Sequence, residues 1–333
     1  MEVKLIAMQS DISKKKLFED IIGQEFAKTF LNAIIQKDRL STAYLFSGPQ
    51  GVGKKLTALR FLEGLLTTGL PSARERRRLE SYNHPDLLWI EPTYQNQGRL
   101  ISKSQAIEEG LNTRNPPQIR LEQIREVGRF LAKSPLEAKF GIVVIEAVEK
   151  MAESAANALL KTLEEPKNGI LILITSRPEK LLQTIHSRCQ KIPFYALSQK
   201  NFELIVNQII NEKDLKVSNL LNQKEMILIS NGSPGAFIEN IQVWNSIPET
   251  LWPKLKELPK NSIDAITLAK LISEELNVEN QIWLINWIQY NLWNKANNSM
   301  SIKRLENLRE QLISFVQPRL AWEVALLEIN FIN

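Results

Sequence analysis

Apolar residues in the first two hundred positions alternate between short continuous runs and stretches with the spacing of a helix. Residues 141–145 and 170–174 are continuous aliphatic runs, typical of strands buried on both faces of a parallel sheet. Residues 44–46 form a shorter apolar run of strand type. Residues 118–133 place apolar side chains on one helical face, and 153–165 form a further helix. This alternation predicts a right-handed, mostly parallel α/β domain.

Helices are also expected at the start of the chain and throughout its last third. In residues 17–38 an apolar stripe predicts an amphipathic packing helix, and its members are Phe26, Phe30, Leu31, Ile34 and Ile35. Residues 93–117 are rich in Gln, Asn and Pro and are interpreted as a loop. After the last predicted strand only helical patterns remain. The sequence therefore predicts an α/β domain over 1–196, a small helical domain over 197–240 and a second helical domain over 241–333.

Six of the seven tryptophans lie in the predicted C-terminal domain: Trp244, Trp252, Trp283, Trp287, Trp293 and Trp322. Ile282, Trp283 and Trp287 fall on one helical face. Such a stripe is interpreted as core or subunit interface rather than as a ligand box. Just before the predicted C-terminal domain, residues 232–235 read G-S-P-G, which fits either a turn or the start of a helix.

The composition is that of an ordinary soluble protein, with 44% hydrophobic and 24% charged residues in 333 positions. The single cysteine, Cys189, excludes an internal disulfide and a multi-cysteine zinc module. The formal net charge of +5 permits a nucleic-acid partner without requiring one. The first residues are too short and too acidic for a secretory signal, and no run of about 18 apolar residues occurs. We therefore expect a cytoplasmic protein with no membrane partner.

A glycine-rich stretch follows the run at 44–46 and opens a predicted helix. It supplies Gly48, Gly51, Gly53 and Lys54 in the G-x-x-x-x-G-K pattern of a P-loop. Glycines let successive backbone N–H groups surround a phosphate, while the lysine and the helix N-terminus supply positive potential. The next position normally holds a Ser or Thr hydroxyl that binds Mg²⁺, but here it is Lys55, which has no lone pair for a metal. The loop is expected to hold phosphate and to lack ordinary metal chemistry.

The residues at the ends of the two long strand runs bear on whether the chain hydrolyses a nucleotide. A hydrolase places an Asp for Mg²⁺ at the strand tip, usually followed by a Glu that activates the attacking water. Here these positions are Glu146 and Ala147. Glu146 can still reach a metal, but Ala147 has no proton acceptor. Thr175 and Ser176 end the other run, where polar side chains of an α/β sheet often face a ligand.

Two further features have a structural and a functional interpretation. The run from Arg74 to Arg78 contains four arginines without interleaved aromatic residues, so a solvated helical face is favoured over a phosphate-binding patch. His84 precedes a strand-like run at 87–90. It is interpreted as structural because no cysteine or histidine lies at ligand spacing from it.

Two segments are specific enough to suggest a family. Residues 157–166 read N-A-L-L-K-T-L-E-E-P and residues 184–190 read T-I-H-S-R-C-Q, and both closely resemble the AAA+ clamp-loader subunits of replicative DNA polymerases. Residues 22–24 look like that family's adenine-side box, and 232–235 look like the region of its sensor 2. The resemblance covers residues 17–240. It implies an AAA+ P-loop NTPase-like domain, a small helical lid domain and an all-α collar for oligomerisation.

The departures from the family pattern are as informative as the matches. Family members usually carry a four-cysteine zinc module after the P-loop, and this chain has arginines there, so we predict no zinc. An active subunit would have Thr or Ser at position 55, an acidic pair at the strand tip and an arginine just after Gly235. The sequence has Lys55, Ala147 and the pair Ala236 and Phe237 at these places. Positions that serve metal, water and γ-phosphate are lost together, which predicts no intrinsic ATPase.

Arg188 survives within the S-R-C triplet, and the resemblance identifies it with the family's arginine finger, which acts in trans on the γ-phosphate bound by a neighbouring subunit. His186 and Cys189 are interpreted as structural because no oxyanion partner is evident. The candidate nucleotide-binding residues are Gly48, Gly51, Gly53, Lys54, Lys55, Glu146 and Thr175. No metal ligand is predicted. Any bound ATP is expected to be structural, and the Lys55 ammonium is expected to replace part of the missing Mg²⁺ charge.

The resemblance implies a component of the DNA polymerase holoenzyme. Its implied partners are other clamp-loader subunits of the delta and gamma/tau type, the sliding clamp and, through the complex, primed DNA. The rival interpretation is an active AAA+ motor ATPase, either a catalytic loader subunit or a branch-migration enzyme. It predicts robust ATP turnover by the isolated chain. A small-molecule kinase is a weaker alternative, because it leaves the S-R-C triplet and the long helical C-terminus unexplained.

Overall fold

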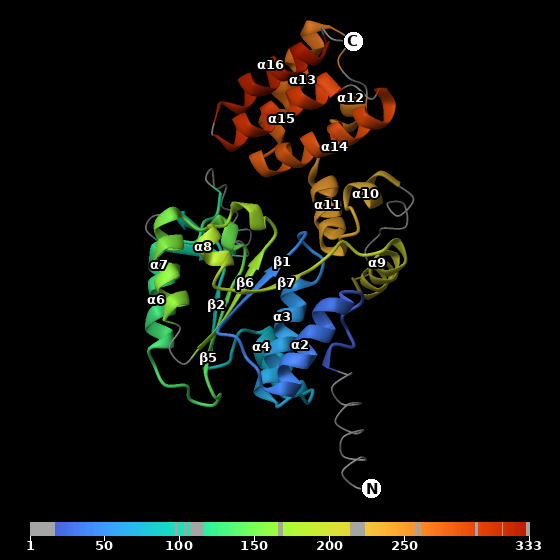
Figure 1. Cartoon of the computed structure of the whole chain (residues 1–333). Coiled ribbons are helices and arrows are strands. Elements are labelled where there is room, and N and C mark those ends of the chain that lie inside the picture. Colours follow the sequence, from blue (N-terminus) through green and yellow to red (C-terminus); the bar gives the residue numbers. More distant parts are fainter. Residues whose placement is uncertain are drawn as a thin grey trace. The chain divides into compact units, whose positions relative to one another are not determined.

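The computed structural model describes residues 17–96, 99–102, 105–106, 116–165, 169–213, 224–256, 259, 261–296, 299–314 and 316–330. The chain divides into two compact units, residues 1–207 and 208–333. The first unit is an α/β domain and the second is helical (Figure 1). The predicted fold class is therefore confirmed. The three-part division, with boundaries after 196 and 240, stays a prediction.

The first unit is built on a parallel sheet, which within the described residues has the strand order β2-β5-β6-β1-β7. The bounds are β1 (Ala43–Ser47), β2 (Leu87–Ile90), β5 (Gly141–Ile145), β6 (Gly169–Thr175) and β7 (Gln190–Pro193). Every neighbouring pair is parallel. Ser47 pairs with Thr175 and with Pro193, so the carboxyl ends of β1, β6 and β7 lie side by side. In an α/β sheet, ligands bind at the carboxyl ends of the strands.

Helices cover both faces of this sheet (Figure 1). One face carries α2 (Glu25–Lys37), α3 (Lys54–Leu66) and α4 (Ala73–Glu80), and the other carries α6 (Leu121–Leu131) and α7 (Glu153–Glu164). Short elements complete the unit: η1 (Val148–Lys150), η2 (Pro178–Lys180), α8 (Gln183–His186) and α9 (Gln199–Lys213), which runs across the boundary into the second unit. The buried, aliphatic strands β1, β5 and β6 lie between the two layers, as the continuous apolar runs predict.

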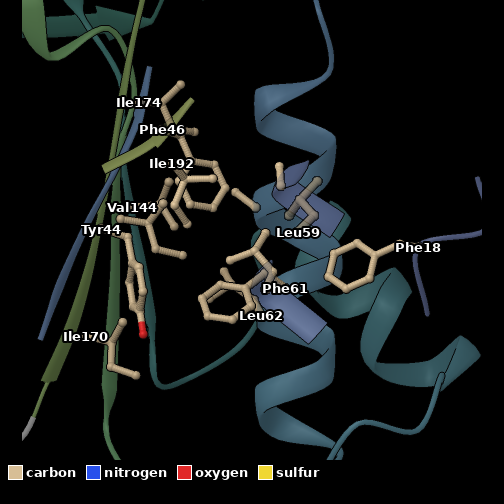
Figure 2. Close-up of a cluster of buried hydrophobic side chains, with 14 of the residues drawn as sticks. Phe18, Tyr44, Phe46, Leu59, Phe61, Leu62, Val144, Ile170, Ile174 and Ile192 are labelled. Carbon is tan, nitrogen blue, oxygen red and sulfur yellow. The ribbon is translucent and has the colours of Figure 1, made fainter. Parts of the chain in front are cut away.

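The alternation of side chains along β1 divides the core into two clusters. Tyr44 and Phe46 face α3, and Figure 2 shows them opposite Phe61 with other buried side chains of the sheet and helix. Ala43 and Leu45 point to the opposite face and pack with residues of α6 and α7. Successive residues of a strand point to opposite faces, so every position of a central strand is buried.

The first helix confirms the amphipathic pattern but not every member of the stripe. Its buried positions are Ala27, Leu31 and Ile34. Phe30 and Ile35 are partly buried against the same core cluster. Phe26 is 55% exposed and stacks on Phe30 with ring centroids 5.9 Å apart. Its assignment to the buried stripe is wrong, because the buried face is centred on the row Ala27–Leu31–Ile34, one position further round the helix.

The expectation of a loop over residues 93–117 is wrong at its beginning. There β3 (Thr93–Asn96) and β4 (Arg99–Ser102) form an antiparallel hairpin, in which Tyr94 pairs with Ile101. Both side chains are buried and pack together. Alternation of polar and apolar residues over strands of four residues is a weak signal beside the many Gln and Asn residues. Residues 97–98, 103–104 and 107–115 of the expected loop lie outside the described residues.

The second unit is all-helical in its described part. Its helices are α10 (Lys224–Ile229), α11 (Pro234–Ser246), α12 (Trp252–Lys256), α13 (Ser262–Glu275), α14 (Val278–Ala296), α15 (Ser299–Ile313) and α16 (Pro318–Asn330). The G-S-P-G segment is a helix start: the Ser233 hydroxyl accepts a hydrogen bond from the Ala236 N–H, and Pro234 occupies the first position of α11. No helix in the described part of the chain is both long and apolar enough to cross a membrane.

The tryptophan stripe of the second unit is largely core. Trp244 stacks on Trp252 with centroids 3.6 Å apart, and Trp287 meets both rings edge-on. Trp283 is buried and its indole N–H donates to Asn240 Oδ1 at 2.8 Å. Buried indole N–H groups need such a partner, so the cluster fixes the packing of α11, α12 and α14. Trp293, in contrast, is exposed.

Asp86 anchors the segment that leads into β5. Its Oδ1 accepts from the Leu136 N–H, and its Oδ2 accepts from the N–H groups of Glu137 and Ala138, all at 2.7 Å. Burial alone would raise the pKa of this carboxyl, but the three backbone donors outweigh it and hold the pKa below its ordinary value. The carboxylate is therefore structural. It also explains His84, whose Nδ1 accepts the Asp86 N–H inside the same turn.

We expect Asp86→Asn to lower the free energy of unfolding by about 1–3 kcal/mol at pH 7, because backbone donors then lose an acceptor. A carboxyl whose folded pKa is depressed stabilises the fold above its ordinary pKa of 3.8, and that contribution disappears as the pH falls through the lower folded value. The gap between wild type and variant should therefore close below about pH 4. Urea unfolding from pH 3 to 7 measures it, and a gap independent of pH would contradict the role of the charge.

Candidate functional site

The glycine loop joins β1 to α3 at the carboxyl edge of the sheet. Gly48, Gly51 and Gly53 have φ values of 155°, 74° and 95°. A Cβ on Gly48 would lie 2.1 Å from the carbonyl oxygen of Phe194, so only glycine fits there. Gly53 is the N-cap of α3, has no side-chain capping bond and is followed by no acidic residue in the first turn. The loop thus has the backbone form and the electrostatics of a phosphate cradle.

Lys54 lies inside this loop and is buried. Its ammonium donates to the carbonyl oxygen of Gly48 at 2.6 Å and to that of Pro49. Burial lowers the pKa of Lys54 to about 8, and the nearby Glu149 carboxylate opposes part of that shift. The lysine is positively charged at pH 7. To reach a phosphate, its ammonium exchanges loop carbonyls for phosphate oxygens.

Lys55 belongs to a compact group with Tyr82, Trp89 and Glu146, which we call the Lys55 cluster. The ammonium lies 2.6 Å from Glu146 Oε1, and the Trp89 indole N–H donates to the same oxygen at 2.6 Å. It also lies 5.2 Å from the ring centroids of both Tyr82 and Trp89. Burial lowers the pKa of Lys55, but Glu146 and Tyr82 outweigh it and raise the pKa above the ordinary value. The ammonium stays charged throughout the neutral range.

These contacts decide whether Mg²⁺ fits. A P-loop magnesium needs a hydroxyl at position 55 and an available carboxylate at the strand tip. Here the hydroxyl is replaced by a cation, and the carboxylate oxygen nearest to it already accepts from Lys55 and Trp89. Within the described ranges, no three His, Cys, Asp or Glu side chains form a group that could hold a metal ion. The residues present do not fit Mg²⁺, whereas those of the loop fit phosphate.

Glu149, in η1, is a site residue that the sequence interpretation missed. Its carboxylate accepts from the hydroxyl of Thr175 at 2.9 Å, and from the hydroxyl and N–H of Ser176 at 2.5 and 3.2 Å. Burial raises the pKa of Glu149, but these bonds outweigh it and the pKa is lowered. The hydroxyls at the tip of β6 are thus engaged with Glu149. The available signal was a carboxylate three residues beyond Glu146, at the end of a strand that pairs with β6.

Gln24 connects three segments around the loop. Its side-chain amide donates to the carbonyl oxygen of Val52 at 3.3 Å and to that of Tyr195 at 2.7 Å, and its Oε1 accepts from the Tyr195 N–H at 3.1 Å. The start of α2, the glycine loop and the segment after β7 are therefore held together by one side chain. This places the residues resembling an adenine-side box next to the phosphate loop, as the resemblance implies.

Arg188 lies at the opposite end of the sheet, where the parallel strands begin. It comes two residues before β7 begins, whereas the glycine loop follows the end of β1, and the two strands are parallel neighbours. Its guanidinium donates to Glu164 Oε1 at 2.7 Å and to the Thr184 carbonyl oxygen at 3.1 Å. The side chain is 34% exposed. The structure thus does not bring Arg188 together with the glycine loop of its own chain.

The remaining polar candidates have structural partners. In α4, Arg76 pairs with the buried Glu63 at 2.9 Å, and Arg78 pairs with Glu75 and Glu137 at 3.1 and 2.8 Å. The interpretation as a solvated helical face therefore holds for Arg74 and Arg77, which are exposed, and not for these two arginines.

The residues beside Arg188 are also structural. The His186 ring nitrogen Nε2 lies 2.8 Å from the Pro178 carbonyl oxygen. Burial raises the pKa of Cys189 to about 12, which removes it as a nucleophile.

The fold and the loop together define an α/β domain of the P-loop NTPase type, followed by a helical unit. The family model described as DNA polymerase III, delta subunit, matches residues 23–198. A second model, the cyanobacterial DNA polymerase III delta prime C-terminal domain, matches residues 205–329. The chain belongs to the DNA polymerase III delta subunit family, within the clamp-loader family of DNA polymerase III subunits. The resemblance drawn from the sequence is confirmed.

Two curated relatives agree with this placement. DNA polymerase III subunit delta' of Bacillus subtilis (strain 168) is 37% identical over 175 residues, which cover 51% of this chain and 46% of that protein. Subunit tau of the same organism is 30% identical over 208 residues, covering 62% of this chain and 34% of that protein. Each match thus spans less than half of the relative's length. A crystal structure of a DNA polymerase III gamma subunit-related protein from Thermotoga maritima has 17% identity and a TM-score of 0.48, covering 92% of this chain and 99% of that one.

Proposed function

We propose that this chain is the delta-prime-type, stationary subunit of a clamp loader. It assembles with delta-type and gamma/tau-type subunits and donates Arg188 to a neighbour's ATP site. In that complex it helps to place the sliding clamp on primed DNA. The observation that carries this proposal is the Lys55 cluster, in which a lysine ammonium lies 2.6 Å from the carboxylate that a hydrolase uses for magnesium.

The departures from the family's sequence pattern are too large for ordinary turnover. Without an acceptor at Ala147, positioning of the attacking water costs roughly 10²–10⁴-fold in rate. Without an arginine at Ala236 or Phe237, the transition-state charge loses a stabilising group worth roughly 10³–10⁵-fold. Glu149 does not compensate, because its oxygens accept from Thr175 and Ser176. A motor ATPase, the rival function, has no support in this arrangement.

The position of Arg188 supports action in trans. The side chain is attached to the edge of the sheet away from its own loop, is partly exposed and is oriented by Glu164. Glu164 is itself 52% exposed, so this ion pair is accessible at the surface of the first unit. A phosphate carries more negative charge than a carboxylate, so a neighbour's γ-phosphate can replace Glu164 as the partner of the guanidinium.

Reconstitution tests the proposal. The chain is mixed with delta-type and gamma/tau-type subunits, and ATP hydrolysis is followed with and without clamp and primed DNA. We expect a stable complex whose DNA-stimulated hydrolysis requires this chain, although the chain alone does not hydrolyse ATP. If the complex fails to form, or reaches full activity without the chain, the proposal is wrong.

A further inference from the structure

We propose that the glycine loop binds the polyphosphate of a nucleotide in its magnesium-free form, with the Lys55 ammonium as a covalently attached substitute for the metal ion. The inference goes beyond the proposed function, because a subunit that only donates an arginine needs no nucleotide of its own. It concerns binding and includes no hydrolysis.

The loop supplies the phosphate contacts. Lys54 is buried with its ammonium among the loop carbonyls, held by Gly48 and Pro49. Phosphate oxygens are stronger acceptors for an ammonium than neutral carbonyls, so a polyphosphate can displace them. At Gly53 the helix begins without a side-chain cap and without an acidic residue in its first turn, so no side-chain carboxylate there competes with the phosphate.

The Lys55 cluster supplies the cation. In a P-loop, residue 55 and the strand-tip carboxylate are the two protein groups that hold Mg²⁺ beside the phosphates. Here they are joined directly, Lys55 Nζ to Glu146 Oε1, and the Trp89 N–H occupies the same oxygen. The positive charge of Lys55 therefore lies where the metal would lie, and the ion pair with Glu146 holds it there.

The aromatic residues keep that charge in place. A lysine side chain normally extends into water, because its ammonium is strongly hydrated. The Lys55 side chain is 44% exposed, but its ammonium lies 5.2 Å from the ring centroid of Tyr82 and 5.2 Å from that of Trp89, and the two rings pack against each other at 4.7 Å. Three contacts from three other segments, the end of β5, β2 and the turn before β2, thus hold one ammonium.

A magnesium–nucleotide complex fits this arrangement poorly. It would bring two further positive charges next to the Lys55 ammonium, and close like charges in a partly buried site repel strongly. It would also require Glu146 to give up its two donors. Polyphosphate without magnesium avoids both the repulsion and the loss of the Glu146 hydrogen bonds, and it is attracted by both Lys54 and Lys55.

Equilibrium dialysis of ATP against the intact chain tests the inference. In EDTA the wild-type chain should bind ATP at least about tenfold more tightly than in excess Mg²⁺. Tripolyphosphate should compete, because recognition is of the phosphates. Lys55→Thr restores the hydroxyl and frees Glu146, so its preference should reverse and binding should become magnesium-dependent. Lys133→Met, which removes an exposed lysine on the other face of the sheet, is the matched control and should behave as wild type.

Three results would overturn the inference: no binding in either condition, wild-type binding that requires Mg²⁺, or an unchanged preference in Lys55→Thr. Because Lys55→Thr also removes an ion pair, its folding is checked by circular dichroism. The comparison of EDTA with Mg²⁺ on the wild-type chain stands whether or not the variant folds. Failure here leaves the arginine-finger proposal untouched, since that proposal is tested by the activity of the assembled loader and not by binding to this chain.

Discussion

Arg188→Ala should lower the DNA-stimulated ATPase of the assembled clamp loader by about 10³-fold while the complex still forms. The guanidinium is partly exposed and paired only at the surface with Glu164, so its removal leaves no buried charge without a partner. The loss should instead appear in the neighbouring subunit, where γ-phosphate charge develops in the transition state. Steady-state hydrolysis with clamp and primed DNA measures it, and gel filtration of the same sample confirms assembly.

The matched control for this experiment is Arg74→Ala. Arg74 is an exposed arginine of the same unit, in α4, and its nearest ionic partner is Glu75 at 3.9 Å. Hydrolysis by the loader should be unchanged in this variant, because an exposed pair at that distance contributes little. Equal activity of Arg188→Ala and wild type would remove the finger role, and equal losses in both variants would indicate a general charge effect.

Glu63→Ala should destabilise the first unit strongly, costing about 3–5 kcal/mol of unfolding free energy. Glu63 is fully buried in α3; its Oε2 accepts from Arg76 Nε at 2.9 Å, and its Oε1 accepts from the Ser72 N–H at 2.8 Å. Arg60 is also buried, with a guanidinium nitrogen 4.0 Å from Glu63. The variant removes the acceptor of Arg76 and of the Ser72 N–H, while Arg60 keeps Asp20 and Glu80 as partners. Urea unfolding followed by far-ultraviolet circular dichroism gives the difference.

Glu80→Ala serves as the comparison, since Glu80 bonds the same Arg60 at 2.8 Å but is 43% exposed. An exposed partner contributes about 0–1 kcal/mol, and water replaces it. The two variants should therefore differ by at least about 2 kcal/mol, and the Glu63 variant should lose stability with no change in the phosphate loop. Similar costs for both would show that burial does not decide the strength of this network.

Most of the first unit could be predicted because its strands are buried on both faces. Continuous aliphatic runs such as Gly141–Ile145 have few other structural solutions, and the observed β5 has these bounds. The helix after the glycines begins at Lys54, as the P-loop pattern requires. The hairpin at Thr93–Ser102 was missed because its short strands are stabilised by one buried pair, Tyr94 with Ile101, and not by a long pattern.

The candidate site shows the limit of sequence reasoning more clearly. The residue types at 55 and 146 can be read from the sequence, but the third member of the cluster cannot, because Trp89 reaches Glu146 only through the pairing of β2 with β5. Glu149 was missed for a similar reason, since its partners Thr175 and Ser176 come from the next strand of the sheet. For a charged run such as Arg74–Arg78, the sequence likewise does not show which neighbour each arginine side chain contacts. Its buried partner, Glu63, lies on a different helix.

Steady-state ATP hydrolysis by the purified chain alone, with and without Mg²⁺, decides most directly whether the loop is a working catalytic site. With Lys55 bound to Glu146 and no acceptor at Ala147, we predict no turnover above that of buffer. Robust hydrolysis that disappears in Lys54→Ala would contradict the assignment of a stationary subunit and would make this chain a motor.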